Sequence, residues 1–123
     1  MIVDDESLIR WSMAETLGNA GYEVSEAGDA KETLRRLSTA PAPDVILLDY
    51  RLPDSNDLKL LETIRQVVPG ASVIMMTAYS TAEMVSHAIK LGAFRVLSKP
   101  VEMSDLAPLV ELAYASRLHR AFP

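Results

Sequence analysis

Five side chains that could do chemistry stand one or two residues after short apolar runs of the chain. They are Asp4, Asp5, Asp49, Thr77 and Lys99. If the three carboxylates lie together, each pair about 4 Å apart repels by about 4 kcal/mol at an effective dielectric near 20. A hard divalent cation, Mg²⁺, would relieve this repulsion and keep coordination positions for phosphate oxygens. Lys99 and Thr77 could then bind phosphoryl oxygens, and we expect Asp49 to be the carboxylate that becomes an aspartyl phosphate.

The apolar runs before these residues predict the strands that bring them together. The runs are Met1–Val3, Val45–Leu48 and Val73–Met76, with weaker members at Tyr22–Ala27 and Phe94–Leu97. Continuous apolar segments of this length are typical of strands buried on both faces in a parallel sheet. Ligands of such sheets bind beyond the carboxyl ends of the strands, which is where the five side chains stand.

Amphipathic segments alternate with the predicted strands and predict five helices. Their expected N-caps are Ser7, Asp29, Ser55 or Asn56, Ser80 or Thr81, and Ser104. In the first helix, the spacing of Leu8, Trp11, Ala14 and Leu17 predicts the packed face. The order is strand then helix, five times, which predicts a single α/β three-layer sandwich with a parallel five-stranded sheet and helices on both faces.

Composition limits the classes of function. The 123-residue chain has 17 acidic and 12 basic side chains and a net charge of −5. This balance argues against direct binding of nucleic acid or of an anionic membrane. The chain has no cysteine, which excludes disulfides and thiolate chemistry and fits the cytoplasmic location that we expect. We expect one domain at residues 1–118 and the start of a linker or tail at 119–123. Because only three residues precede Asp4, we also expect native residues before Met1.

The motifs together resemble the receiver domain of two-component response regulators over essentially the whole chain. The matching segments are Val3–Glu6, Val45–Asp49, Leu52–Pro53, Thr77–Ala78 and Gly92–Pro100. Each is weak alone, but their order and their positions at strand ends are specific. The resemblance implies a flavodoxin-like fold with strand order 2-1-3-4-5. The Leu52–Ser55 segment further resembles regulators that activate transcription with the alternative, sigma-54-type, sigma factor.

The resemblance also implies a role for each site residue. Asp49 would be the phosphorylation site, and Asp5 and Asp49 would bind Mg²⁺ directly. Asp4 would act through water, and Arg51 would supply its backbone carbonyl to the ion. Thr77 and Lys99 would hold the phosphoryl group, and the peptide bond between Lys99 and Pro100 would be cis.

The implied function is a phosphorylation-activated switch and not an enzyme that acts on a diffusible substrate. A sensor histidine kinase would supply the phosphoryl group, and the domain would catalyse only its own phosphorylation and slow hydrolysis. Phosphorylation would remodel the face of the fourth helix, fifth strand and fifth helix. We expect that face to control an output domain C-terminal to this one, in transcription regulation, or to form a homodimer.

Two positions depart from the family pattern, and two other functions remain open. Val96 stands where an aromatic residue is common, and Asn56–Asp57 stands where Asp-Gly is frequent. One alternative is a haloacid-dehalogenase-like phosphatase, which needs a second acid where this chain has Arg51. The other is an interaction module that works without phosphorylation, which Val96 favours and the complete acidic set disfavours.

Overall fold

The structure is a computed structural model that describes residues 1–120. Strands and helices alternate along these residues. The strands are β1 (Ile2–Val3), β2 (Glu26–Ala27), β3 (Val45–Asp49), β4 (Ser72–Thr77) and β5 (Arg95–Ser98). The helices are α1 (Ser7–Asn19), α2 (Ala30–Thr39), α3 (Lys59–Val67), α4 (Ala82–Lys90) and α5 (Met103–Arg120). Helix α5 thus continues two residues past the predicted domain end at 118, and residues 121–123 of the predicted tail lie outside the described residues. No helix within residues 1–120 is both long enough and apolar enough to cross a membrane.

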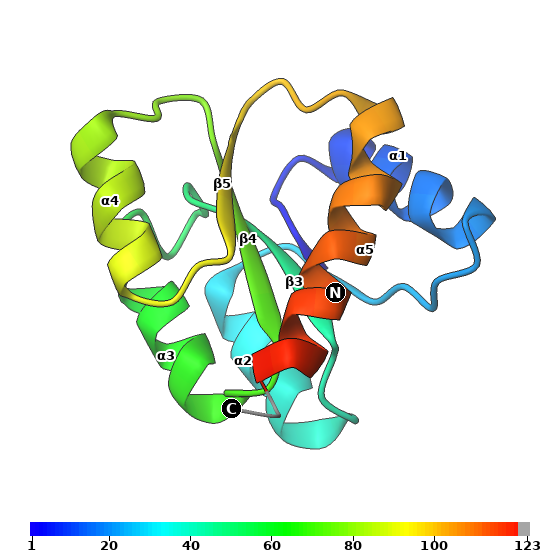
Figure 1. The fold of residues 1–123 in the computed structure, drawn as a ribbon, viewed down its shortest axis with the longest axis horizontal. Coiled ribbons are helices and arrows are strands. Elements are labelled where there is room, and N and C mark those ends of the chain that lie inside the picture. The colour runs from blue at the N-terminus through cyan, green and yellow to red at the C-terminus, as the bar shows by residue number, and fades with distance from the viewer. Residues whose placement is uncertain (121–123) are drawn as a thin grey trace.

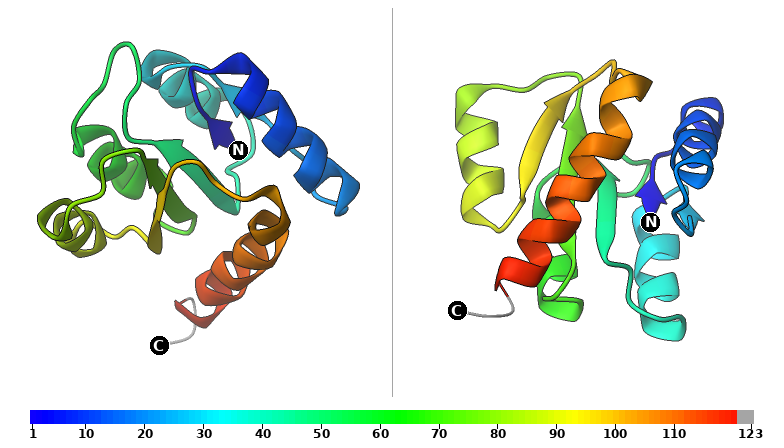
Figure 2. Two further views of the ribbon diagram at one scale, coloured as in Figure 1. Left: turned by 90° about the horizontal axis from the view of Figure 1, so that it is seen from above. Right: turned by 45° about the vertical axis from the view of Figure 1, so that its right-hand side comes forward.

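The sheet has the predicted topology. Its strands pair in parallel in the order β2-β1-β3-β4-β5. Helices cover both faces, which makes three layers (Figures 1 and 2). Helices α1 and α5 pack on one face, whereas α2, α3 and α4 pack on the other. The predicted α/β sandwich is therefore confirmed.

The two central strands form the middle of the core. In β3 and β4, the side chains of Ile46–Leu48 and Val73–Met76 are almost completely buried. Successive residues of a strand point to opposite faces, so Leu47 packs with α1 and α5 while Leu48 packs with the other helices. Burial on both faces explains why the middle of each strand is apolar without interruption, and why the polar side chains Asp49, Ser72 and Thr77 stand at the strand ends.

The predicted packed face of α1 is wrong in part. Leu8 is 74% exposed and Trp11 is 58% exposed, whereas Met13 and Leu17 are buried with Ile9 packed beside them. Ile9, Met13 and Leu17 are spaced by four residues, so they form a second apolar stripe along the same helix. Periodicity cannot choose between two stripes, and contact with α5 and the sheet selects the second.

Some predicted helix caps are confirmed and others are wrong. The Asp29 side chain accepts a hydrogen bond from the Glu32 N–H, and Thr81 accepts one from the Met84 N–H. Ser7 and Ser104 lie within the first turns of α1 and α5 instead of at their caps. Helix α3 begins later than predicted, after Asp57, whose carboxylate accepts the Lys59 N–H. Strand β2 is likewise shorter than the apolar run Tyr22–Ala27.

Candidate functional site

Strand register brings the predicted site residues to one edge of the sheet. Val3 of β1 is paired with Leu48 of β3, so Asp4 and Asp49 follow side by side. Thr77 ends β4 and is paired with Ser98 of β5, and Lys99 comes next. The Lys99 N–H donates to the Thr77 carbonyl, which continues the ladder to the end of both strands. The residues come from four strand ends because parallel strands place all their carboxyl ends on the same side.

Three carboxylates converge at this edge. Asp4, Asp5 and Asp49 each offer an oxygen, and these oxygens all lie within 4.8 Å of one another. Asp4 and Asp49 are buried, whereas Asp5 is exposed at the mouth of the site. A set of hard oxygen ligands open to solvent on one side suits Mg²⁺, which keeps several water molecules when it binds protein. The residues present therefore fit the predicted metal.

Lys99 bridges the two buried carboxylates. Its Nζ lies 3.0 Å from Asp4 Oδ2 and 3.0 Å from Asp49 Oδ2, and 3.8 Å from Glu6 Oε1 at the rim. The bond between Lys99 and Pro100 is cis, as the family resemblance implies. A single ammonium thus offsets part of the negative charge, and its donors already point toward the Asp49 carboxylate.

Burial and charge act in opposite directions on the two central groups. Burial raises the pKa of Asp49, and the nearby Asp4 carboxylate raises it further, although the hydrogen bond from Lys99 lowers it in part. Burial alone would lower the pKa of Lys99, but the hydrogen bonds to Asp49 and Asp4 outweigh burial and raise it. Lys99 is therefore held as a cation, while Asp49 is a carboxylate whose charge is incompletely compensated.

Backbone N–H groups hold the carboxylates in place. Asp4 Oδ1 accepts the Glu6 N–H at 2.9 Å, and Asp49 Oδ1 accepts the Arg51 N–H at 3.2 Å. The contact that ties Arg51 to the site is thus its N–H, and the role of its carbonyl stays a prediction. Thr77 is buried at the same edge, where its Oγ1 accepts the N–H of Tyr79 at 3.1 Å.

Other residues at this edge were not predicted from the sequence. The Arg51 guanidinium lies over the Tyr79 ring, 5.0 Å from its centroid, and so connects the loops after β3 and β4. Arg10 of α1 reaches the Asp4 backbone, although in sequence it is one more charge on a helix. Neither contact leaves a spacing signal: Arg51 and Tyr79 are 28 positions apart, and the six-residue separation of Asp4 and Arg10 spans a strand end and a helix start and matches no helical or strand period. Val96 packs, half-buried, against the core beneath α2, α3 and α4.

Comparison with known proteins yields one consistent family. Residues 1–111 match the response regulator receiver domain. The DNA-binding transcriptional regulator NtrC of Escherichia coli K12 is 38% identical over 112 residues, which cover 91% of this chain and 24% of NtrC. The chain therefore spans about a quarter of the length of the NtrC regulators that it matches.

Solved structures agree with this match. A CheY-like receiver domain protein from Methanospirillum hungatei JF-1 has a TM-score of 0.89 and 31% identity, covering 97% of this chain and 94% of that one. The receiver domain of the beryllofluoride-activated NtrC4 dimer has a TM-score of 0.87 and 28% identity, covering 94% of this chain and 95% of that one. Both likenesses extend over nearly the whole fold.

Proposed function

We propose that this chain, which belongs to the response regulator receiver domain family, is a signalling switch that accepts a phosphoryl group on Asp49 from a sensor histidine kinase. The observation that carries this proposal is the Asp49 carboxylate itself. It lies at the end of a central strand, 3.0 Å from the Lys99 ammonium and within the acidic cluster. In this proposal the domain acts on its own phosphorylation and hydrolysis only, and not on a diffusible substrate.

The acidic cluster would hold Mg²⁺ through residues of this chain. Asp5 and Asp49 would be direct ligands, Asp4 would act through water, and the Arg51 carbonyl would complete the protein ligands. When bound, the ion would neutralise charge on the phosphoryl oxygens. Its binding is favoured because the three carboxylate oxygens already lie within 4.8 Å of one another and Lys99 alone cannot balance them.

The remaining residues would position the phosphoryl group. An Asp49 oxygen would form the new P–O bond as the bond to the donor breaks, with the donor taking the bonding electrons. Lys99 already donates toward Asp49 Oδ2 and would pair with a phosphoryl oxygen. The Thr77 hydroxyl, now engaged by the Tyr79 N–H, would turn to donate to another phosphoryl oxygen, which would move the loop after β4.

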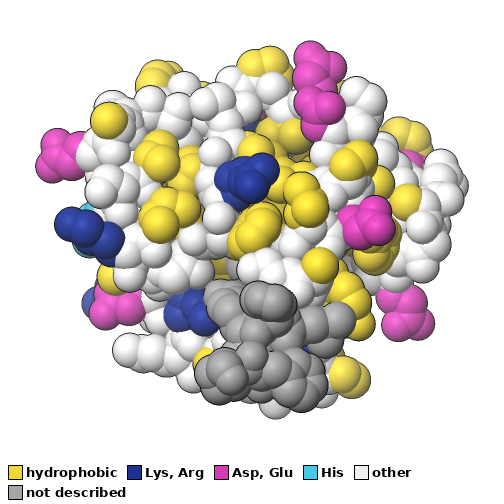
Figure 3. Space-filling view, viewed as in Figure 1, with side chains coloured by type: hydrophobic (Ala, Val, Ile, Leu, Met, Phe, Trp, Pro, Cys, Tyr) yellow, Lys and Arg dark blue, Asp and Glu magenta, His cyan; other side chains and the backbone are white. Residues whose placement is uncertain are grey.

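The output surface would be the face of α4, β5 and α5. Hydrophobic side chains gather there, interrupted by isolated charges (Figure 3). A hollow of about 390 Å³ lies between β5 and α5, lined by residues that include Leu97, Leu109 and Leu112. Movement of the loop after β4 would reach this face through α4. We place there the contact with a second copy or with a C-terminal output domain that regulates transcription, as the name of the relative NtrC suggests.

Covalent modification of Asp49 tests the proposal. Wild-type protein treated with acetyl phosphate and Mg²⁺ should gain the mass of one phosphoryl group, and EDTA should prevent the gain. Asp49→Asn should stay unmodified, whereas Asp105→Asn, an exposed carboxylate in the first turn of α5, should react like wild type. Equal modification of wild type and Asp49→Asn would contradict the proposal and favour an interaction module that works without phosphorylation.

A further inference from the structure

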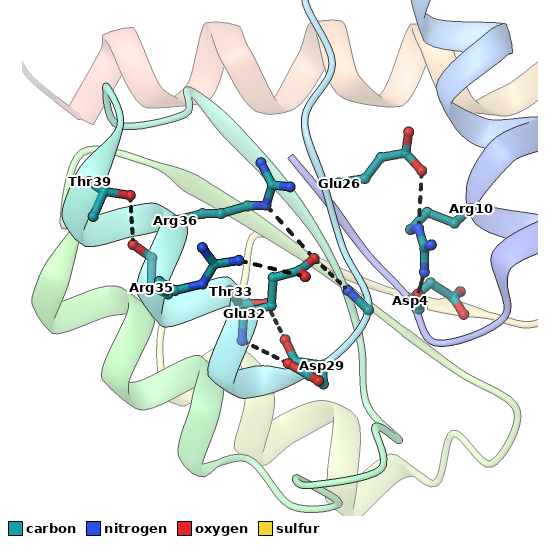
Figure 4. Close-up of polar contacts among 10 residues, drawn as sticks. Asp4, Arg10, Glu26, Asp29, Glu32, Thr33, Arg35, Arg36 and Thr39 are labelled. Carbon is teal, nitrogen blue, oxygen red and sulfur yellow. Dashed lines mark hydrogen bonds and ion pairs between the residues drawn. The ribbon is translucent and has the colours of Figure 1, made fainter.

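Arg10 joins helix α1 to the ends of β1 and β2. Its Nη1 donates to the backbone carbonyl of Asp4 at 2.6 Å, and its Nε donates to Glu26 Oε1 at 3.0 Å (Figure 4). The Arg10 side chain is only 22% exposed. A half-buried arginine side chain whose guanidinium makes two directed hydrogen bonds is held in one orientation, unlike a charge on a solvated helix face.

The carbonyl that Arg10 contacts belongs to the peptide unit between Asp4 and Asp5. A peptide unit is planar, so fixing the direction of its oxygen also fixes the direction in which the chain enters Asp5. The rest of Asp4 is already held, since its N–H donates to the Ala27 carbonyl at 3.1 Å and its carboxylate accepts from Glu6 and Lys99. Arg10 supplies the contact that sets the step from Asp4 to the exposed Asp5.

Glu26 makes this contact compatible with a cation site. An isolated guanidinium close to the acidic cluster would oppose the binding of a divalent cation, because like charges repel. The Glu26 carboxylate lies 3.0 Å from Arg10 Nε and compensates its charge. The pair can therefore orient the peptide without adding a net positive charge beside the carboxylates.

Gly28 leaves the space that the guanidinium occupies. A Cβ atom at position 28 would lie 3.3 Å from Arg10 Nη1, closer than most such contacts. The turn after β2 is thus shaped to admit Arg10, while β2 itself supplies Glu26. Three segments that are separate in sequence meet around one side chain.

We propose that Arg10, held by Glu26, is a positioning residue for the divalent cation site and acts by orienting the Asp4–Asp5 peptide so that the Asp5 carboxylate faces Asp4 and Asp49. This inference rests on the Mg²⁺ site of the proposed function. Arg10 does not touch the cation. Loss of the Arg10 side chain frees the Asp4–Asp5 peptide to rotate. The Asp5 carboxylate must then be ordered when the cation binds, and the affinity for the cation falls.

Titration of ¹⁵N-labelled protein with MgCl₂, followed through the amide resonances of Asp5 and Glu6, measures the effect. Arg10→Ala should raise the Mg²⁺ dissociation constant about tenfold, as loss of partners behind ligating residues generally does. It should also shift the Asp5 amide resonance before any Mg²⁺ is added. Arg10→Lys, which keeps the charge on a single donor nitrogen but not the two-pronged geometry of the guanidinium, should recover part of the affinity. The matched control is Arg36→Ala, which removes an exposed arginine paired with Glu32 at 3.8 Å on α2 and should bind Mg²⁺ like wild type.

The outcomes separate this inference from the proposed function. If wild type binds Mg²⁺ and folded Arg10→Ala binds it equally well, the positioning role is wrong while the proposed function stands. If wild type does not bind Mg²⁺, both are wrong. Should Arg10→Ala not fold, as judged by its amide spectrum in EDTA, Arg10→Lys decides: weaker binding than wild type supports the role, and equal binding overturns it.

Discussion

Replacing Asp49 with asparagine should stabilise the metal-free protein, although it removes the residue on which the proposed function depends. Asp49 is buried beside Asp4 and Asp5, with oxygens within 4.8 Å of one another, and each such pair repels by about 3.5 kcal/mol at an effective dielectric of 20. The opposing attraction to Lys99, at 3.0 Å, amounts to about 5.5 kcal/mol on the same scale. Removing the Asp49 charge ends both repulsions and one attraction, so the variant should gain about 1.5 kcal/mol of unfolding free energy.

The expected stabilisation by Asp49→Asn agrees with the raised pKa of Asp49. A carboxyl group whose pKa is higher in the folded than in the unfolded state binds protons preferentially when folded. Its contribution to stability therefore decreases as the pH rises from 3.8 through its folded pKa. The advantage of Asp49→Asn should be largest above the folded pKa of Asp49 and should shrink as the pH falls through that pKa toward 3.8, because wild-type Asp49 then becomes neutral.

Urea unfolding in EDTA measures this difference. A gain of the expected size moves the midpoint by about 1 M urea for a domain of this length. Asp105→Asn is the control for overall charge, since it removes the same charge from the exposed first turn of α5. It should lower the unfolding free energy by about 0.3 kcal/mol, because an acidic side chain in the first turn of a helix is stabilising. Adding Mg²⁺ should narrow the gap by stabilising wild type. Equal or lower stability of Asp49→Asn in EDTA at neutral pH would refute the reasoning.

Two further substitutions test the charges around the site. Lys99→Met should cost about 3 kcal/mol in EDTA, because Asp4 and Asp49 stay buried without their cation. The pKa of Lys99 is raised, so its contribution to stability is complete below pH 10.5 and is lost as the pH rises through the higher pKa of the folded state. Urea unfolding of Lys99→Met should therefore lack the loss of stability that wild type shows at alkaline pH. The same dependence of stability on pH in both proteins would contradict this role of Lys99. Asp54→Asn should cost about 0.5 kcal/mol at neutral pH, because the Asp54 carboxylate accepts the N–H groups of Ala30 and Lys31 at the start of α2 and asparagine offers a single acceptor oxygen. Those hydrogen bonds lower the pKa of Asp54, so its contribution to stability is present above pH 3.8 and is lost as the pH falls through the lower pKa of the folded state. Urea unfolding at neutral and at acid pH should show that the stabilities of wild type and Asp54→Asn become equal in acid.

The order of strands and helices and the acidic residues of the site could be predicted from the amino-acid sequence. Apolar runs such as Val45–Leu48 are uninterrupted because a central parallel strand is buried on both faces, and that constraint is local enough to read from composition. Polar residues that directly follow such runs must stand at the carboxyl edge of the sheet. Asp4, Asp49 and Lys99 could therefore be placed together before any distance was known, and the 3.0 Å contacts of Lys99 with both carboxylates agree with that placement.

Which helix surfaces face the core, and which residues support the site, depend on contacts between distant segments and could not be predicted from the sequence. Helix α1 carries two apolar stripes, and packing against α5 buries Met13 and Leu17 while leaving Leu8 and Trp11 exposed. The contact of Arg10 with Glu26 and the Asp4 carbonyl joins three segments whose separation in sequence has no fixed period. The periodicity of apolar residues indicates which side of a helix or strand is apolar, because that property depends only on residues close together in the sequence. The partner that each side meets depends on how distant segments fold back on one another, which a single sequence does not record.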